Sequence, residues 1–149
     1  MSDQYRQRLT LVGRRQHSIS AFETLLTEFL ILFFCMLVGH VLADFPLQGE
    51  YIARGKNGSQ PLPATPWWYV LSVHAFLHAA FVFAAVQVAW MLRVEVSLTP
   101  IWWLAALEFA HHWVVDNAKC HGRIGYLTDQ GLHIAFKAIW VAVAVSHLP

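Results

Sequence analysis

The sequence predicts an all-α integral membrane protein whose four transmembrane helices form an antiparallel bundle. Hydrophobic residues make up 57% of the 149 residues and charged residues only 13%, whereas roughly 25% of a typical soluble domain is charged. Four apolar segments of membrane-spanning length follow one another along the chain, separated by polar segments. The length suits a single domain. A formal net charge of +1 lacks the basic excess of nucleic-acid-binding proteins, so we expect no nucleic-acid partner.

The chain is expected to begin with a polar, basic tail over residues 1–22, followed by a membrane domain over residues 23–149. The first helix of that domain is expected at about residues 24–45, because this apolar run has the roughly 20 residues that a bilayer crossing requires. A cleaved signal peptide is the alternative, since residues 41–43 resemble a cleavage site. The run is longer than a signal sequence usually has, and three further apolar segments follow it, which favours a membrane span.

Three more helices are expected after this one. A loop rich in glycine and proline over residues 46–65 precedes the second helix, at about residues 66–92. The third helix is expected at about residues 100–117 and the fourth at about residues 128–148. Paired tryptophans lie at the start of the second and third helices, as is typical of helices that begin at a membrane interface.

Basic residues that flank the expected helices favour an orientation with both chain ends on the inner side of the membrane. In a bacterium this membrane would be the inner, cytoplasmic membrane. The inner side would then carry Arg6, Arg8, Arg14, Arg15 and Arg93, and the outer side Arg54, Lys56, Lys119 and Arg123.

Each expected helix contains two polar residues separated by four positions, which places both side chains on one face of the helix. Two of these pairs lie at the C-terminal ends of the first and third helices, and two lie in the N-terminal halves of the second and fourth. In an antiparallel bundle these four ends meet at one membrane face, so the eight side chains are expected to converge. The pairs are His40 with Asp44, His74 with His78, His112 with Asp116, and Asp129 with His133.

Ionisable side chains inside a membrane are costly and usually serve a function. Imidazole with carboxylate is the ligand set of zinc, manganese or iron, so we expect the eight residues to bind a divalent metal, zinc before the others. The set suffices for two ions, or for one ion with carboxylates that orient the histidines. Asp44, Asp116 and Asp129 are also candidate catalytic residues, as metal ligands or general bases. Glu108, one turn before His112, is a further candidate for the same network.

Motifs in these helices resemble those of the DUF3307 family of small bacterial and phage membrane proteins. The matching stretches are GHVLADFPLQ at residues 39–48, His74 with His78, Glu108 to Lys119 with an HxxxDxxK pattern, and DQGLH at residues 129–133. The resemblance implies a helical membrane protein and adds Gln48 and Gln130 as candidate site residues. It implies no activity.

The leading functional hypothesis is a membrane-embedded metal-dependent hydrolase that acts on a lipid-like substrate near the bilayer surface. Haem binding between facing histidines is an alternative, although the neighbouring carboxylates do not favour it. A third hypothesis is metal or proton transport or sensing, which would require a homo-oligomer because four helices are few for a carrier. In a fourth, the protein is a non-catalytic membrane accessory protein whose polar residues only join the helices.

Overall fold

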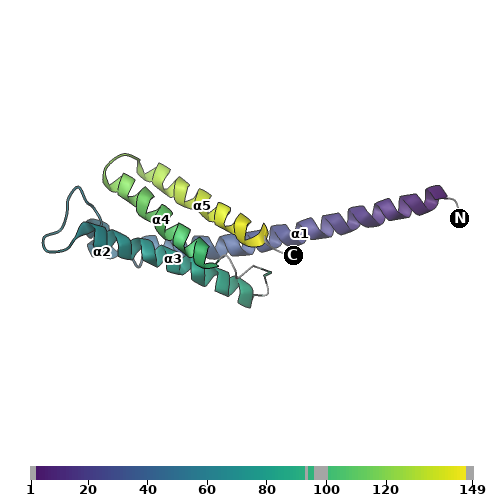
Figure 1. Cartoon of the computed structure of the whole chain (residues 1–149), viewed down its shortest axis with the longest axis horizontal. Coiled ribbons are helices and arrows are strands. Elements are labelled where there is room, and N and C mark those ends of the chain that lie inside the picture. Colours follow the sequence, from purple (N-terminus) through teal and green to yellow (C-terminus); the bar gives the residue numbers. More distant parts are fainter. Residues whose placement is uncertain (1–2, 93, 96–100, 147–149) are drawn as a thin grey trace.

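The computed structural model describes the backbone of residues 3–92, 94–95 and 101–146, and the side chains of these ranges from Ile19 onward. Within these ranges the chain forms five α-helices and no strand, which confirms the all-α prediction. The helices are α1 (Asp3–Asp44), α2 (Gly49–Gly55), α3 (Trp67–Met91), α4 (Ile101–Cys120) and α5 (Tyr126–Ser146) (Figure 1). Helices α3, α4 and α5 correspond to the segments expected over residues 66–92, 100–117 and 128–148, of which residues 100 and 147–148 lie outside the described chain.

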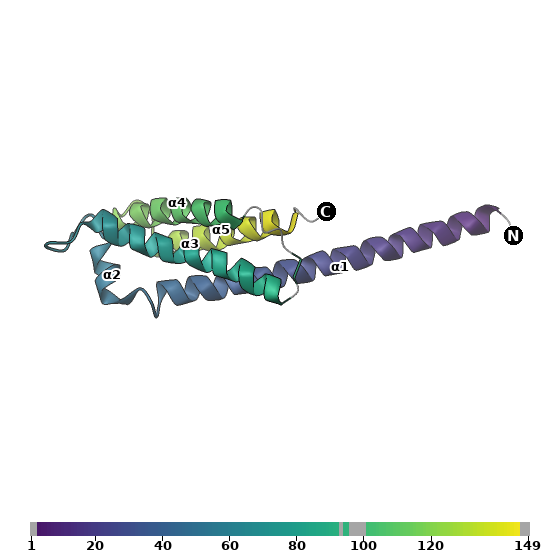
Figure 2. The same ribbon diagram turned by 60° about the horizontal axis from the view of Figure 1, so that its bottom comes forward.

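The four long helices form a closed ring with alternating direction. Helix α1 packs against α3 and α5, and α4 packs against the same two helices. Successive long helices run in opposite directions in both ribbon views (Figures 1 and 2). Helix α2 packs against α3 and lies, with the turn between α4 and α5, at one end of the bundle, which we call the loop end. Helix α1 extends far beyond the opposite end (Figure 2).

The start of α1 differs from the sequence-based expectation. Helix α1 begins at Asp3 and not near residue 24, so the polar tail is helical and continues into the apolar segment. No proline occurs before Pro46. Because adding residues to an existing helix is much easier than nucleating one, a proline-free polar sequence can prolong the packed part of α1.

Helix α2 is the second difference, because it occupies part of the loop expected over residues 46–65. Its first residue, Gly49, has a φ of 55°, in the left-handed region that glycine adopts without strain. Glu50 in the first turn and Arg54 in the last turn complement the helix dipole, and their side chains form an ion pair of 3.2 Å. These local interactions stabilise a short helix that the glycine and proline content of the segment does not indicate.

The interior of the bundle is divided along its length. The half towards the extended end of α1 has an apolar core, whose buried members are Leu32, Met36, Val82, Ala85, Val86, Ala89, Val94, Ile101, Leu104, Trp140, Val141, Ala144 and Val145. The half at the loop end also contains buried histidine, aspartate, glutamate and lysine side chains. The apolar half holds the helices together. Because buried ionisable groups cluster at functional sites, the polar half is the candidate for such a site.

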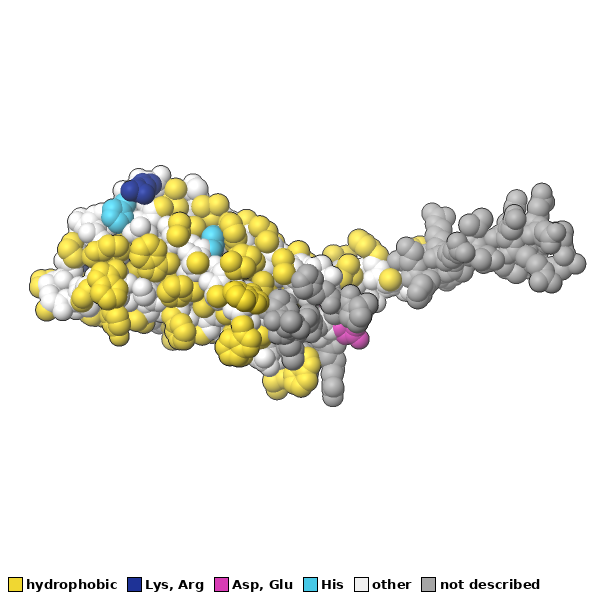
Figure 3. Space-filling model, viewed as in Figure 1, with side chains coloured by type: hydrophobic (Ala, Val, Ile, Leu, Met, Phe, Trp, Pro, Cys, Tyr) yellow, Lys and Arg dark blue, Asp and Glu magenta, His cyan; other side chains and the backbone are white. Residues whose placement is uncertain are grey.

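Apolar side chains also cover much of the face of the bundle seen in Figure 3. Phe34, Phe76 and Trp103 are 66%, 67% and 71% exposed. By length and composition alone, two helical segments of the described chain could cross a membrane, Ile19–Asp44 and Trp67–Met91, with mean hydropathies of 2.3 and 1.8. Helices α4 and α5 are less apolar because they carry acidic residues and lysines in addition to histidine.

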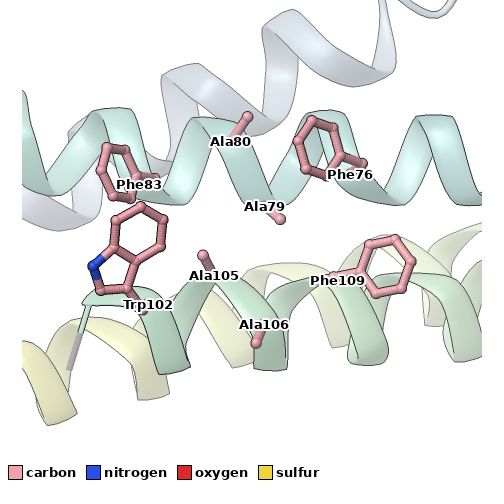
Figure 4. A pocket seen from close by; sticks show the side chains of 8 residues that line it. All are labelled: Phe76, Ala79, Ala80, Phe83, Trp102, Ala105, Ala106 and Phe109. Atoms are coloured by element: carbon pink, nitrogen blue, oxygen red, sulfur yellow. The ribbon is translucent and has the colours of Figure 1, made fainter.

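An apolar groove follows the outer side of the contact between α3 and α4 (Figure 4). Small alanine side chains let the two helices approach each other, and larger aromatic side chains flank the alanines. The groove is lined by Ala79, Ala80, Ala105 and Ala106, with Phe76 and Phe109 towards one end and Phe83 and Trp102 towards the other. The groove adds a concave surface to the apolar exterior.

We expect Gly39→Ala to destabilise the bundle, because α1 approaches α3 closely at this glycine. A Cβ atom at Gly39 would lie 2.9 Å from the Cβ of Phe81, and overpacking of this kind costs about 1–3 kcal/mol. Gly131→Ala in α5 is the matched control, since a Cβ there meets no atom within 4 Å and alanine favours a helix by about 0.5–1 kcal/mol. Thermal unfolding in detergent micelles, followed by circular dichroism, measures both changes. Equal midpoints for the two variants would contradict the close contact.

Candidate metal centre

Five buried imidazoles meet at the loop end, and every long helix contributes at least one. They are His40 from α1, His74 and His78 from α3, His112 from α4 and His133 from α5, all at most 3% exposed. In each helix the polar pair lies one turn apart on the inner face, because residues four positions apart share a helix face. The alternating direction of the helices then places all four pairs at the same end of the bundle.

Three of these rings form a stack. His78 stacks on His112 with ring centroids 3.5 Å apart, and His112 stacks on His133 at 4.0 Å. Positive charges on neighbouring rings at these distances would repel each other strongly in a buried site. The stack therefore suits neutral imidazoles, which is the form of histidine that binds metals.

Asp44 lies beside three histidines. Its Oδ1 is 3.0 Å from His78 Nε2 and 3.3 Å from His74 Nε2, and its Oδ2 is 3.5 Å from His40 Nε2. Asp44, His74, His78 and His112 each offer one ligand atom, and these four atoms lie within 4.8 Å of one another. We call these four residues the Asp44 group.

Asp116 lies at the centre of a second group. Its Oδ2 is 3.4 Å from His74 Nε2 and 3.7 Å from His112 Nε2, and its Oδ1 is 3.8 Å from His133 Nε2. His112, Asp116 and His133 also offer ligand atoms within 4.8 Å of one another, and we call them the Asp116 group. Since His112 belongs to both groups, the two candidate sites are adjacent.

The donor set fits a divalent metal in two respects. Ligand atoms about 2.0–2.1 Å from a tetrahedral zinc ion lie roughly 3.3 Å apart, close to the 3.0 and 3.3 Å from Asp44 Oδ1 to His78 and His74. In addition, both ring nitrogens of His74, His112 and His133 are buried without a hydrogen-bond partner among the described residues. Buried polar atoms are almost always satisfied, and a bound metal would satisfy one nitrogen of each ring that it binds.

Two lysines at the loop end pair with carboxylates of the cluster. Lys56 Nζ lies 2.5 Å from Asp116 Oδ2 and donates a second hydrogen bond of 3.2 Å to Gln48 Oε1. Lys119 Nζ lies 2.7 Å from Asp129 Oδ2. Each of these carboxylates thus faces a lysine on one side and an imidazole on the other.

A third lysine lies deeper in the bundle. Lys137 donates to Glu108 Oε1, and the other oxygen of Glu108 accepts a hydrogen bond of 2.8 Å from Trp140 Nε1. Glu108 Oε1 is also 3.6 Å from His112 Nδ1. Glu108 therefore joins the network beside His112 but is already neutralised by Lys137, so it lies at the boundary between the site and the apolar core.

The carboxylates of the cluster outnumber its lysines by one. The acids are Asp44, Glu108, Asp116 and Asp129, and the lysines are Lys56, Lys119 and Lys137. Asp44 is the acid that forms no ion pair with a lysine or arginine among the described residues. A buried carboxylate needs a compensating positive charge. The Asp44 group is therefore where a metal cation is most favoured.

Gln130 connects the two sides of the cluster. Its Nε2 donates to Asp44 Oδ2 at 3.1 Å and to Asp129 Oδ2 at 3.2 Å, while its Oε1 lies 3.3 Å from His40 Nε2. His40 and Asp129 are thus within the cluster but outside both ligand groups. Their contacts place them where they can orient the ligand residues.

Sequence reasoning gave Lys56 no role beyond that of a basic loop residue. The side chain is 6% exposed and points into the cluster. It lies in the segment between α2 and α3, which has no periodic pattern, so spacing alone gives no signal for it.

His111, next to His112, stacks on Phe136 at 3.8 Å and belongs to neither ligand group.

Comparison with known proteins identifies a family without assigning an activity. The family model described as "Protein of unknown function (DUF3307)" matches residues 32–148 of the chain. This range contains every residue of both ligand groups. No curated protein and no solved structure matches the chain.

Lys137→Met should destabilise the protein by about 3–5 kcal/mol, because it leaves the buried Glu108 carboxylate without its cation. The double variant with Glu108→Gln removes both charges and should recover most of that loss. Unfolding in detergent with increasing denaturant, followed by circular dichroism, gives both free energies. If the double variant were as unstable as Lys137→Met alone, the loss would not arise from an unpaired charge.

Proposed function

This chain belongs to the DUF3307 family, and we propose that it is a membrane-embedded, metal-dependent hydrolase that acts on a lipid-like substrate. The observation that carries the proposal is the convergence of imidazoles from α3 and α4 around Asp44, the one acid of the cluster without a lysine partner. A site of this composition is expected to bind a divalent cation.

The proposed membrane position rests on the exterior of the bundle. Trp68 and Trp90 are 55% and 54% exposed near the two ends of α3. They are separated by about 33 Å along a helix that rises 1.5 Å per residue, close to the roughly 30 Å thickness of a bilayer core. Tryptophan at both interfaces and apolar side chains between them are typical of a transmembrane helix. We propose that α1, α4 and α5 cross the bilayer beside α3, with bilayer lipid in the groove between α3 and α4.

The proposed orientation has both chain ends on the inner side. The long extension of α1 and the end of α5 lie at the same end of the bundle (Figure 1), so the loop end would face outward. The side chains of Arg93 and of the tail arginines, on which the orientation rests, lie outside those that the structure describes.

The depth of the site supports a lipid-like substrate. His74 follows Trp68 by six residues, which is about 9 Å along α3 and therefore just below the interface. The cluster reaches the surface at Asp44, which is 11% exposed, and at Lys119, which is 31% exposed. A molecule whose polar part lies at the head-group level would approach the cluster from this side.

In this proposal the Asp44 group holds the metal, and a second ion would use the Asp116 group. A divalent ion supplies Lewis acidity, which makes water a better nucleophile and polarises the bond to be broken. The chain itself would hold and move protons. Asp129 and Asp116 lie 3.4 and 3.8 Å from His133 Nε2. When only the Asp44 group holds an ion, one of these carboxylates can accept the proton that water loses, and His133 can pass it to the leaving group.

The geometry gives less support to the other hypotheses. The stacked rings of His78, His112 and His133 are in contact, so a haem between any two of them would require the helices to separate. Residues that only join helices would be expected to hydrogen-bond to one another, yet Nδ1 of His74 and both ring nitrogens of His112 have no hydrogen-bond partner among the described residues. Transport or sensing would use the same metal site, and substrate turnover separates that role from hydrolysis.

We expect His74→Ala and His112→Ala each to lose most of the zinc that the wild-type protein retains after purification in detergent without chelator. Each variant removes one ligand from the Asp44 group. His111→Ala is the matched control, because His111 neighbours His112 and lies outside both groups. Inductively coupled plasma mass spectrometry measures zinc, manganese and iron per protein.

A wild-type protein that retains no metal and takes up none on addition would overturn the proposed metal centre. Metal loss of equal size in the His111→Ala variant would show that the effect is not specific to the ligands. Hydrolysis of an ester by the metal-loaded protein, lost in His74→Ala, would separate a hydrolase from a metal carrier.

The two cysteines test the membrane position. Cys35 lies in the apolar part of α1 and Cys120 at the end of α4. In open membrane sheets, a membrane-impermeant maleimide should label Cys120 in a Cys35→Ser protein but label Cys35 in a Cys120→Ser protein only after detergent is added. Labelling of Cys35 without detergent, or extraction of the protein by alkaline carbonate, would contradict a transmembrane α1.

A further inference from the structure

The cluster carries two lysine ammonium groups on its side facing the loop end, from Lys56 after α2 and Lys119 in the last turn of α4. Building on the proposed metal-dependent hydrolase, we propose that these two lysines bind the phosphate group of the substrate, which makes the substrate a phosphate ester. This narrows the substrate class from lipid-like molecules in general to anionic ones.

Lys56 is held in place by the packing of its neighbour. The residue caps the C-terminus of α2, and the preceding Gly55 packs so closely on α3 that a Cβ there would lie 3.1 Å from Val70 Cγ1. The Lys56 side chain is 6% exposed. A long side chain loses considerable conformational entropy when it is buried. Its fixed direction therefore indicates a defined partner inside the cluster.

The present partner of Lys56 is an oxygen that a metal would also use. Asp116 Oδ2 lies 2.5 Å from Lys56 Nζ and faces His74 and His112 at 3.4 and 3.7 Å. A divalent ion in the Asp116 group would lie within a few ångströms of the ammonium, where like charges repel strongly in a buried site. Lys56 would then need another anionic partner, and a substrate phosphate can be that partner.

Lys119 provides a second donor that reaches the surface. It is 31% exposed, and its Nζ lies 2.7 Å from Asp129 Oδ2 and 5.3 Å from the centre of the Tyr126 ring. Lys119 lies in α4 and Lys56 directly after α2. They pair with Asp129 and Asp116, the two acids beside His133. Two ammonium groups on this side of the cluster would favour a multi-oxygen anion, such as phosphate, over a neutral ester.

The net charge of the cluster favours the same substrate class. With neutral histidines, four carboxylates and three lysines leave one negative charge. One bound divalent ion would make the cluster positive, and a second ion would increase that charge further. A phosphate monoester carries about −1.5 to −2 at pH 7 and would compensate it. A neutral substrate would leave a buried net positive charge, which is unfavourable.

Isothermal titration calorimetry with inorganic phosphate tests the proposal on the full-length, zinc-loaded protein in detergent. We expect phosphate to bind the wild-type protein, and Lys56→Gln and Lys119→Gln each to weaken binding roughly tenfold or more, the size expected for one charge-assisted hydrogen bond. Arg54→Gln is the matched control, since Arg54 is an exposed cation two residues before Lys56 and pairs with Glu50. Lys56→Arg should retain binding because it keeps the charge.

The zinc content of the same samples separates the two proposals. A wild-type protein that binds zinc but no phosphate, or a Lys56→Gln/Lys119→Gln protein that binds phosphate as tightly as the wild type, would overturn the phosphate site alone. A protein that binds no zinc would overturn the metal centre and this inference with it. Melting temperatures of the variants close to that of the wild type show that the loss of binding is not a loss of folding.

Two further probes distinguish the source of the phosphate. Glycerol 3-phosphate represents a water-soluble ester, and phosphatidate in mixed micelles represents a lipid head group, with phosphatidylcholine micelles as the control. Binding or hydrolysis of phosphatidate that depends on Lys56 would support a lipid phosphate. The same dependence with glycerol 3-phosphate alone would assign a soluble phosphate ester and overturn a lipid substrate.

Discussion

Buried charge is the constraint on which the loop end of this bundle depends. Four acids lie in or beside the interior, where an uncompensated carboxylate costs several kcal/mol. Lys56, Lys119 and Lys137 neutralise three of them, each from a different part of the chain. These ion pairs connect three parts of the chain to the acids: the segment after α2, the end of α4 and the middle of α5. Within the described chain, the polar partners of the remaining acid, Asp44, are imidazoles and an amide, so Asp44 is where the proposed cation would be most favoured.

The division of the interior separates stability from function. Apolar residues of all four long helices pack together in the half away from α2, and this packing does not depend on any ligand. The polar half contains imidazole nitrogens that have no hydrogen-bond partner in the described part of the chain, and such atoms lower stability unless a ligand binds them. The Glu108–Lys137–Trp140 network lies between the two halves. The apolar half can offset the stability that is lost by burying charged and unsatisfied groups, because these groups are confined to the loop end.

Much of the candidate site could be predicted from the sequence, because each long helix contributes two polar residues that lie four positions apart. Residues such as His112 and Asp116 lie four positions apart, so a helix fixes their common face, and antiparallel packing fixes their common end. Two features could not be predicted in this way. The path of the chain around Lys56 depends on the contact of Gly55 with α3, which no periodicity records. The start of α1 at Asp3 reflects propagation of the helix through polar residues. No proline interrupts this stretch, so the sequence does not mark where the helix begins.

The placement of the ligand pairs at one end also limits how the protein can change in length during evolution. A residue inserted inside α3 between His74 and His78 would rotate one ring relative to the other by about 100° and shift it by about 1.5 Å along the helix. The same insertion near the opposite end would leave every ligand in place. Helix α1 shows such an extension, because it continues far past the bundle at the end away from the cluster (Figure 2). Residues added or removed at that end would leave the positions of the ligand side chains unchanged.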